Sequence, residues 1–246
     1  MHRLFISDLH LSDDTPEIES ALKALLEAQP LPDALIILGD LFEAWIGDDD
    51  DSSLASRIKA LLSGVADGGC EVMLARGNRD FILGSRFADE VGATLLGDET
   101  VMEVADHPTL LMHGDTLCTD DTDYQQFRAL VHNPDWQREI MSKPLDERRQ
   151  LARQLRAMSA DAASNKPEDI MDVNEEAVRD RMAAHSVKYL VHGHTHRPAR
   201  HAMGAGERIV LGDWTRDKGW VLRERNKTLT LESFAIRECK PDTGPL

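Results

Sequence analysis

The sequence predicts a layered α/β fold, and two features of its first 115 residues lead to that prediction. Short apolar runs alternate along the chain with segments whose apolar residues follow helical spacing. This alternation is typical of a sheet covered by helices, because each strand returns through a helix that packs on the sheet. The length of 246 residues and the apolar content of 41% suit a single domain, residues 1–246, that carries an insert.

The expected strands are the short apolar runs themselves. In chain order they are residues 4–6, 34–38, 72–75, 109–112, 187–191, 209–211, 220–222 and 229–231. The last two are separated by Asn226-Lys227, a pair that suits the tight turn of a hairpin. Two helices are expected between the early strands, because apolar residues recur there at i, i+4, i+7 and i+8. Those residues are Ile18, Leu22, Leu25 and Leu26, and then Leu54, Ile58, Leu61 and Leu62.

Residues from about 120 to 186 break this alternation and predict a helical insert. They contain no convincing strand, and helical spacing runs from Tyr124 to Val131 and from Leu145 to Met158. Arg149, Arg153 and Arg156 are spaced by four and three residues, so they share one helix face. That face is either an ordinary solvated surface or an anion-binding cap, which would be notable in a chain with a net charge of −16.

The charge balance and the cysteines exclude several classes of protein. With 28 basic and 44 acidic residues, we expect no nucleic-acid partner and no tight binding to anionic membranes by charge, although a local basic patch stays open. Cys70, Cys118 and Cys239 are scattered, which predicts buried free thiols in a reducing compartment. The sequence shows no signal peptide and no apolar run of membrane-spanning length, so we expect a soluble chain.

Five of the apolar runs are followed at once by side chains that bind metal ions. These segments are Ser7-Asp8-Leu9-His10, Gly39-Asp40-Leu41-Phe42-Glu43, Arg76-Gly77-Asn78-Arg79-Asp80, His113-Gly114-Asp115 and His192-Gly193-His194-Thr195-His196. Ligands of open α/β sheets bind beyond the carboxyl ends of the strands, so we expect these segments to converge on one site. The glycines beside the ligands predict tight turns and close approach of the backbone. The pairs Asp8/His10 and His194/His196 are two residues apart, so in extended backbone each pair points to one side.

Seven of these side chains form the candidate set of metal ligands. They are Asp8, His10, Asp40, Asn78, His113, His194 and His196. Seven nitrogen and oxygen ligands are too many for one tetrahedral zinc ion. They suit two cations of the Mn²⁺, Fe²⁺ or Zn²⁺ kind with one carboxylate bridging them. Each motif alone is weak, and the prediction depends on their combination at the ends of five expected strands.

In order and spacing, these motifs resemble those of the calcineurin-like metallophosphoesterases over roughly residues 1–220. The resemblance implies a four-layer α/β/β/α sandwich with a dinuclear centre. It implies that Asp8, His10, Asp40 and His196 bind one metal ion. Asp40, Asn78, His113 and His194 would bind the other ion, so that Asp40 bridges the two.

One position departs from that family. A histidine that assists the leaving group usually follows the Gly-Asn pair, and here that position is Arg79. An acid matters least when the leaving group is a phosphate monoester, whose second pKa is about 6. An arginine can instead hold phosphate oxygens in a bidentate grip. Arg79 therefore favours a phosphoanhydride substrate, and we assign catalytic roles to Asp40, Asn78, Arg79 and His113.

A narrower resemblance links residues 39–49, 77–81 and 170–174 to the UDP-2,3-diacylglucosamine diphosphatases of lipid A synthesis. It implies metal-dependent hydrolysis of UDP-2,3-diacylglucosamine at the α-phosphorus, giving UMP and 2,3-diacylglucosamine 1-phosphate (lipid X). It also implies two Mn²⁺ ions per chain and a peripheral position on the cytoplasmic side of the inner membrane. The implied substrate contacts are Asn78, Arg79, Asp121, Ser159, Ala163, Lys166 and His194. The family has an asparagine where this chain has Ala163, with Asn165 nearby.

Two other functions stay open at this point, and no oligomeric state is predicted. The first is a related phosphoesterase that acts on nucleotides, cyclic nucleotides or protein phosphate. The second is a catalytically silent scaffold with the same fold. Arg79 and residues 45–49 count against the first, and the complete ligand set counts against the second. The insert would hold two acyl chains or simply pack on the domain, through the apolar stripe Leu145, Leu151, Leu155 and Met158.

Overall fold

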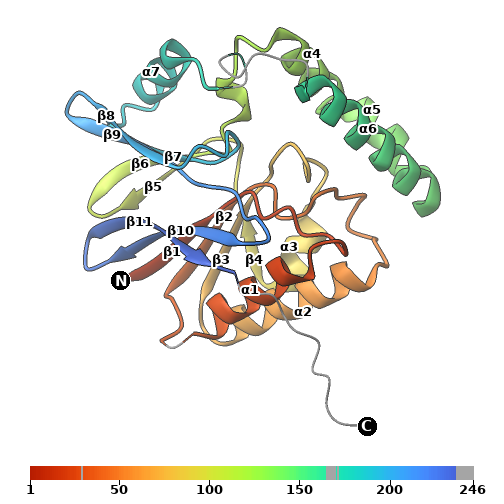
Figure 1. The fold of residues 1–246 in the computed structure, drawn as a ribbon, viewed down its shortest axis with the longest axis horizontal. Coiled ribbons are helices and arrows are strands. Elements are labelled where there is room, and N and C mark those ends of the chain that lie inside the picture. The colour runs from red at the N-terminus through yellow and green to blue at the C-terminus, as the bar shows by residue number, and fades with distance from the viewer. Residues whose placement is uncertain (29, 165–169, 171, 237–246) are drawn as a thin grey trace.

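The computed structural model places two β-sheets face to face, with helices on both outer sides (Figure 1). It describes all residues except 29, 165–169, 171 and 237–246. The first sheet has the order β11 (Thr228–Ala235), β10 (Lys218–Arg225), β1 (His2–Ile6), β2 (Ala34–Leu38), β3 (Glu71–Ala75) and β4 (Ala93–Leu95). The second has the order β5 (Thr100–Val104), β6 (His107–Leu111), β7 (Tyr189–His192), β9 (Gly206–Val210) and β8 (Ala199–Met203).

Three helices cover the outer face of the first sheet: α1 (Pro16–Glu27), α2 (Ser53–Asp67) and α3 (Ser85–Val91). The apolar spacing seen in the sequence is the buried stripe of the first two helices. It consists of Ile18, Leu22 and Leu26 in α1 and Leu54, Ile58 and Leu62 in α2. Strand β2 is buried along its whole length, as expected for a parallel strand covered on both faces.

The side chains of the strands alternate between two cores, as the period of two in a strand requires. Leu4 and Ile6 of β1 face the helices, whereas Phe5 faces the second sheet. Val191 of β7 and Ile209 of β9 pack against Phe5 from the second sheet. The space between the sheets is therefore a continuous apolar layer that fixes their relative position.

The fourth layer covers the outer face of the second sheet. Helix α7 (Glu175–Ala184) packs there through Val178 and Met182 against Leu110 and Leu190 of the sheet. The short 3-10 helix η1 (Asp115–Leu117) contributes Leu117 to the same core. The order of layers is helix, sheet, sheet and helix, which confirms the predicted four-layer fold.

Three more helices lie between η1 and α7, in the segment where the sequence predicts a helical insert. They are α4 (Thr122–Val131), α5 (Pro134–Met141) and α6 (Leu145–Ser164). These helices project beside the sandwich, and α6 lies above the end of the first sheet's helical layer in Figure 1. No helix in the described part of the chain combines the length and the apolar character that a bilayer-spanning segment needs.

The structure also has elements that the apolar runs did not predict. Helices α3 and α5 are only seven and eight residues long, and strand β4 has three residues. Strands β5 and β8 form the two edges of the second sheet, and their residues are mostly exposed or half-buried. Because an edge strand is only partly buried, it needs no apolar run, and β5 and β8 therefore left no sign in the sequence. The predicted hairpin is confirmed, with Asn226 and Lys227 at φ values of 49° and 66° between β10 and β11.

Candidate metal centre

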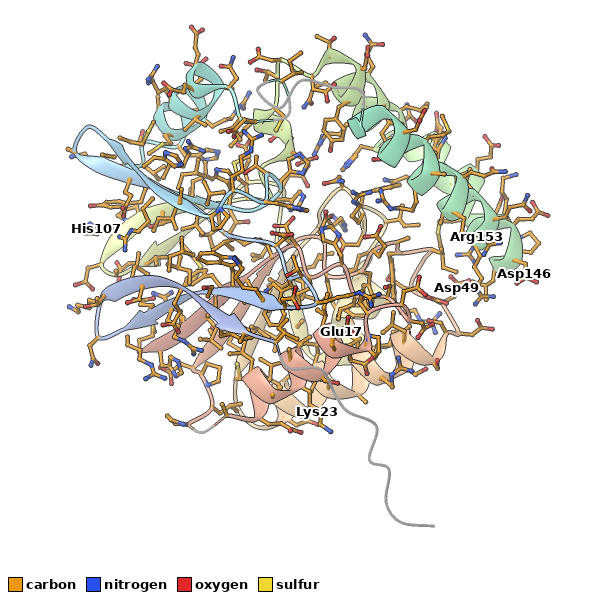
Figure 2. All side chains as sticks on the ribbon, in the orientation of Figure 1. Glu17, Lys23, Asp49, His107, Asp146 and Arg153 are labelled. Carbon is orange, nitrogen blue, oxygen red and sulfur yellow. The ribbon has the colours of Figure 1, made fainter. Side chains whose placement is uncertain are left out.

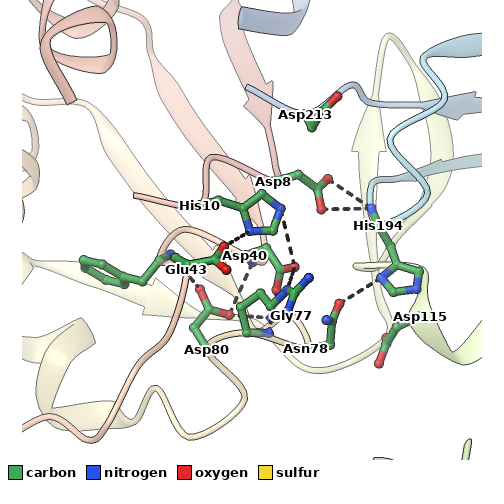
Figure 3. A network of polar contacts seen from close by, with 12 residues as sticks. Asp8, His10, Asp40, Glu43, Gly77, Asn78, Asp80, Asp115, His194 and Asp213 are labelled. Atoms are coloured by element: carbon green, nitrogen blue, oxygen red, sulfur yellow. Dashed lines mark hydrogen bonds and ion pairs between the residues drawn. The ribbon is translucent and has the colours of Figure 1, made fainter. Parts of the chain in front are cut away.

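The five ligand segments meet at one edge of the sandwich, where strands of both sheets end together (Figure 3). The Asp8 carboxylate, after β1, accepts the backbone N–H of His194, after β7, at 3.0 Å. The amide oxygen Oδ1 of Asn78 lies 2.8 Å from Nδ1 of His194 and 3.0 Å from Nε2 of His113. The structure therefore brings together residues that are up to 186 positions apart in the sequence.

The ligand atoms form two overlapping groups that share Asp8. Asp8, His10 and His196 each offer one ligand atom within 4.8 Å of the others, and so do Asp8, Asp40 and His113. Oδ2 of Asp40 lies 4.0 Å from Nε2 of His10 and 3.7 Å from Nε2 of His113. Asp40 belongs to the second group but also lies near His10 of the first, which is the position that a carboxylate bridging two metal ions would need.

The charges of this cluster fit divalent cations. Asp8 and Asp40 are 0% and 1% exposed, and two buried carboxylates so close together are unfavourable without a compensating positive charge. Burial raises the pKa of Asp40, and the nearby charge of Asp8 raises it further, although the neighbouring histidines oppose this. Burial alone would lower the pKa of His113, but Asp40, Asp8 and Asp115 together outweigh burial and raise it to about 9. A set of imidazole, amide and carboxylate donors around two acids matches the preferences of such metal ions.

The backbone at the ligands corrects one expectation from the sequence. Five of the seven candidate ligands have a positive φ, so they are not in extended backbone. The values are 55° for Asp8, 50° for His10, 52° for Asp40, 68° for His194 and 56° for His196. Strand β1 ends at Ile6 and β7 at His192, and the ligands occupy turns beyond these ends. The left-handed conformation costs about 1–2 kcal/mol for each such residue, and strain of this kind is typical of functional sites.

Close packing of the turns confirms the predicted role of the glycines. A Cβ on Gly39, which has a φ of 86°, would lie 2.7 Å from Gly77 and from Nδ1 of His113. A Cβ on Gly77 would collide with the Asp40 carboxylate. Any larger residue at either position would push apart the two turns that carry Asp40 and Asn78.

Asp80 holds the same two turns together, a role the sequence did not reveal. Its buried carboxylate accepts the backbone N–H groups of Gly77 and Leu41, each at 2.7 Å, with longer contacts to two more. Burial, with the charge of Asp40, raises the pKa of Asp80 to about 6. The only sign of this role in the sequence was the position of Asp80, directly after Gly77-Asn78-Arg79.

Arg79 presents free donors next to the ligand cluster. Its Nε and Nη1 atoms are buried and have no hydrogen-bond partner within the described chain. Nε lies 3.8 Å from Oδ2 of Asp40. Buried, unsatisfied guanidinium donors are unfavourable unless a ligand accepts from them, so this arrangement fits an incoming phosphate group.

A cavity of about 520 Å³ connects the ligand cluster to the helical segment. Its polar end includes Asn78, Arg79, His194 and His196. Its apolar wall includes Trp45, Ile46, Phe81, Phe127, Trp136, Ile140, Leu151 and Leu155. Asp121, Ser159 and Met158 also line the cavity, whereas Leu145 of the expected stripe does not. The side chain of Ala163 and the whole of Lys166 lie outside the described residues.

The arginine face of α6 is not a free anion-binding surface. Arg149 is paired with Asp50 and Asp51, and Nε of Arg156 donates to Oε1 of Glu43 at 2.7 Å. Only Arg153 of the three, in the middle of α6, stays exposed (Figure 2). Acidic residues of the loop after β2 therefore neutralise Arg149 and Arg156.

A fourth arginine, which the sequence did not single out, makes the firmest link to that loop. Arg148 is only 4% exposed, and its two Nη atoms donate to the two carboxylate oxygens of Asp49. Its Nη1 also donates to the backbone carbonyl of Ile46 at 2.6 Å, and Nε to that of Lys143 at 3.0 Å. The contacts with Asp49 and Ile46 attach α6 to the loop that follows Asp40, whereas Lys143 lies just before α6.

Comparison with known proteins adds independent findings. The sequence model of the calcineurin-like phosphoesterase family matches residues 1–198. A protein of Cellvibrio japonicus named UDP-2,3-diacylglucosamine hydrolase is 47% identical over 241 residues, which cover 96% of this chain and 100% of its own. One of the same name from Escherichia coli O7:K1 is 49% identical over 219 residues, 87% of this chain and 91% of its own.

A solved structure described as a novel archaeal phosphodiesterase has a similar fold. It matches with a TM-score of 0.52 over 96% of this chain and 99% of its own, at 12% sequence identity. At that identity the likeness concerns the arrangement of strands and helices and carries nothing about the substrate.

Proposed function

This chain belongs to the calcineurin-like phosphoesterase family, and we propose that it hydrolyses UDP-2,3-diacylglucosamine to UMP and lipid X in lipid A synthesis. One observation carries the proposal beyond the family. A single cavity has the ligand cluster and Arg79 at one end and apolar side chains of the helical segment along its wall. A substrate with a diphosphate and two acyl chains needs both surfaces in one continuous space.

The ligand cluster would hold two Mn²⁺ ions. Asp8, His10, Asp40 and His196 would bind one, and Asp40, Asn78, His113 and His194 the other. When bound, such ions lower the pKa of water and offset the charge of phosphoryl oxygens. The donor chemistry and the buried carboxylates support this proposal.

Arg79 would bind the diphosphate and orient it for in-line attack of water at the α-phosphorus. Its unpartnered guanidinium nitrogens can donate hydrogen bonds to phosphate oxygens and offset charge that develops during the reaction. The bond to the bridging oxygen breaks, and the leaving group is the phosphate of lipid X, which needs little help from an acid at neutral pH. No protein nucleophile is needed, because water attacks the phosphorus. Asp40, Asn78 and His113 would contribute by holding the metal ions.

Within the predicted insert, residues 120–186, helices α4–α6 would serve as the cap over the acyl chains, whereas α7 covers the second sheet; the whole would form one domain, residues 1–246. Leu151 and Leu155 of α6 would contact the acyl chains, while Asp121 and Ser159 lie where they can contact the polar part of the substrate. The exposed apolar side chains Leu130 and Met158 of the cap support a peripheral position at the cytoplasmic side of the inner membrane. Flotation of the protein with phospholipid vesicles tests that position, and failure to float with or without substrate would contradict it.

Labelled water tests the proposed chemistry. Hydrolysis in H₂¹⁸O should place the label in UMP, whereas label in lipid X would show attack at the other phosphorus. A panel of nucleotides, cyclic nucleotides and phosphopeptides separates the alternative of a related phosphoesterase with another substrate. Faster hydrolysis of any of these than of UDP-2,3-diacylglucosamine would overturn the assignment.

A further inference from the structure

We propose that Glu43 is a positioning residue that links the cap helix α6 to the metal centre, by holding His10 with one carboxylate oxygen and Arg156 with the other. The inference rests on the proposed metal centre and adds a residue to it. Glu43 follows Asp40 by three positions, and the seven-ligand set leaves it without a role.

The first half of the link is the contact with His10. The Nε2 atom of this ring lies 3.2 Å from Nε2 of His196 and 4.0 Å from Oδ2 of Asp40, so it faces the ligand cluster. The other ring nitrogen, Nδ1, lies 3.2 Å from Oε2 of Glu43 (Figure 3). This contact is an ion-pair distance without the alignment of a full hydrogen bond. Histidines that bind metals commonly direct their second nitrogen at a carboxylate, which fixes the tautomer and the ring orientation.

The position of the ring also argues against Glu43 as a ligand itself. His10 stands between Glu43 and the atoms of Asp40 and His196, because its two nitrogens face opposite ways. Neither group of ligand atoms within 4.8 Å of one another includes Glu43. Its carboxylate therefore acts on the metal centre through His10.

The second half of the link is the ion pair with the cap. Nε of Arg156, in the middle of α6, donates to Oε1 of Glu43 at 2.7 Å across 113 positions of sequence. Arg156 also lines the cavity together with Leu155 and Ser159. Each oxygen of one carboxylate thus has a separate partner, one in the metal centre and one in the wall of the cavity.

A shared carboxylate makes the two partners energetically dependent on each other. A metal ion that fixes His10 also fixes Glu43, and this favours the seated position of Arg156 and of α6. By linkage, a seated cap must favour metal binding by the same factor. The Arg148–Asp49 pair offers a matched control, because it attaches the same helix to the same loop without touching a ligand.

The test measures Mn²⁺ binding and hydrogen exchange in the full-length protein freed of metal. Wild type, Glu43→Ala, Glu43→Gln and Asp49→Ala are titrated with Mn²⁺, and their melting temperatures establish that each is folded. We expect Glu43→Ala to weaken binding of one of two Mn²⁺ ions about 10- to 100-fold. Glu43→Gln, which keeps an oxygen for His10, should recover part of that loss, and Asp49→Ala should bind as wild type does.

Hydrogen exchange separates positioning from a merely structural role. Mn²⁺ should slow exchange of the α6 amides around Arg156 in wild type and in Asp49→Ala, but not in Glu43→Ala. Wild-type Mn²⁺ affinity in Glu43→Ala, or an equal loss in Asp49→Ala, would overturn the inference. A wild-type protein that binds no Mn²⁺ would overturn the proposed metal centre itself, and the role of Glu43 with it.

Discussion

Replacing Arg148 by lysine should release the cap helix from the body of the protein. Lysine keeps the positive charge but loses the fork that donates to Asp49, Ile46 and Lys143 at once. The bond from the buried guanidinium to the Ile46 carbonyl contributes about 1.5 kcal/mol, whereas the bond to Lys143 lies within the helical segment and does not attach it to the body. The ion pair contributes at most about 1 kcal/mol, because Asp49 is 44% exposed and screened by water. If lysine keeps one contact worth about 1 kcal/mol, the net loss is about 1.5 kcal/mol.

That loss should appear as local opening, because α4–α6 project from the sandwich and lie outside its sheets. A difference of about 1.5 kcal/mol corresponds to roughly 10-fold faster exchange of the α6 amides. Hydrogen-exchange mass spectrometry measures this, and peptides from β1 and β2 should be unchanged.

The matched control is Arg138→Lys, in which an arginine paired with Asp135 is 72% exposed. This change should alter exchange by less than about twofold, as expected for a surface pair within one helix. Unchanged exchange in α6 of Arg148→Lys, or an equal rise throughout the sheets, would refute the reasoning.

Three further predictions test other parts of the molecule. Leu155→Gln in the cavity wall should raise KM for the diacylated substrate about 10-fold or more in steady-state assays, with unchanged Mn²⁺ affinity; an unchanged KM would exclude acyl contact at that wall. Burial raises the pKa of the Cys70 thiol to about 11 and of the Cys118 thiol to about 12, so mass spectrometry should find neither alkylated by iodoacetamide at pH 8 until the chain unfolds. Burial lowers the pKa of His192 to about 3; the charge of Arg208 acts in the same direction and the hydrogen bond to Gly193 opposes it. Below about pH 6.5 the unfolded chain therefore binds a proton at this residue that the folded chain does not bind, so acid favours unfolding. Metal-free protein should lose about 2 kcal/mol of stability from this residue between pH 7 and 5 in urea titrations, and His192→Asn should lose correspondingly less; equal losses in both would contradict the assignment.

The sequence was a good guide to the buried strands and to the residues that follow them. Strands β1, β2 and β3 were visible as apolar runs because they are buried on both faces, and Asp8, Asp40 and Asn78 follow them directly. Because carboxyl ends of neighbouring strands share an edge, the convergence of these polar residues could be predicted without knowing any distance.

Other features depend on tertiary contacts that no local pattern contains. The positive φ of Asp8 and Asp40 arises in turns held by backbone hydrogen bonds between the two segments, such as Asp8 N–H to Gly39 O at 3.1 Å. The partners of the α6 arginines lie about 100 positions earlier in the sequence. A signal did exist, because residues 48–51 are all acidic and residues 148–149 are both basic, but composition alone cannot say that two such runs meet.

The most direct test of the proposed function is Mn²⁺-dependent release of UMP from UDP-2,3-diacylglucosamine, with UDP-N-acetylglucosamine as the unacylated control. We expect UMP from the diacylated substrate alone, only when Mn²⁺ is present, and none from a folded Asp40→Ala variant. Failure of the wild-type protein to release UMP from either compound, together with hydrolysis of a generic bis-phosphoester, would contradict the proposed substrate while keeping the metal centre.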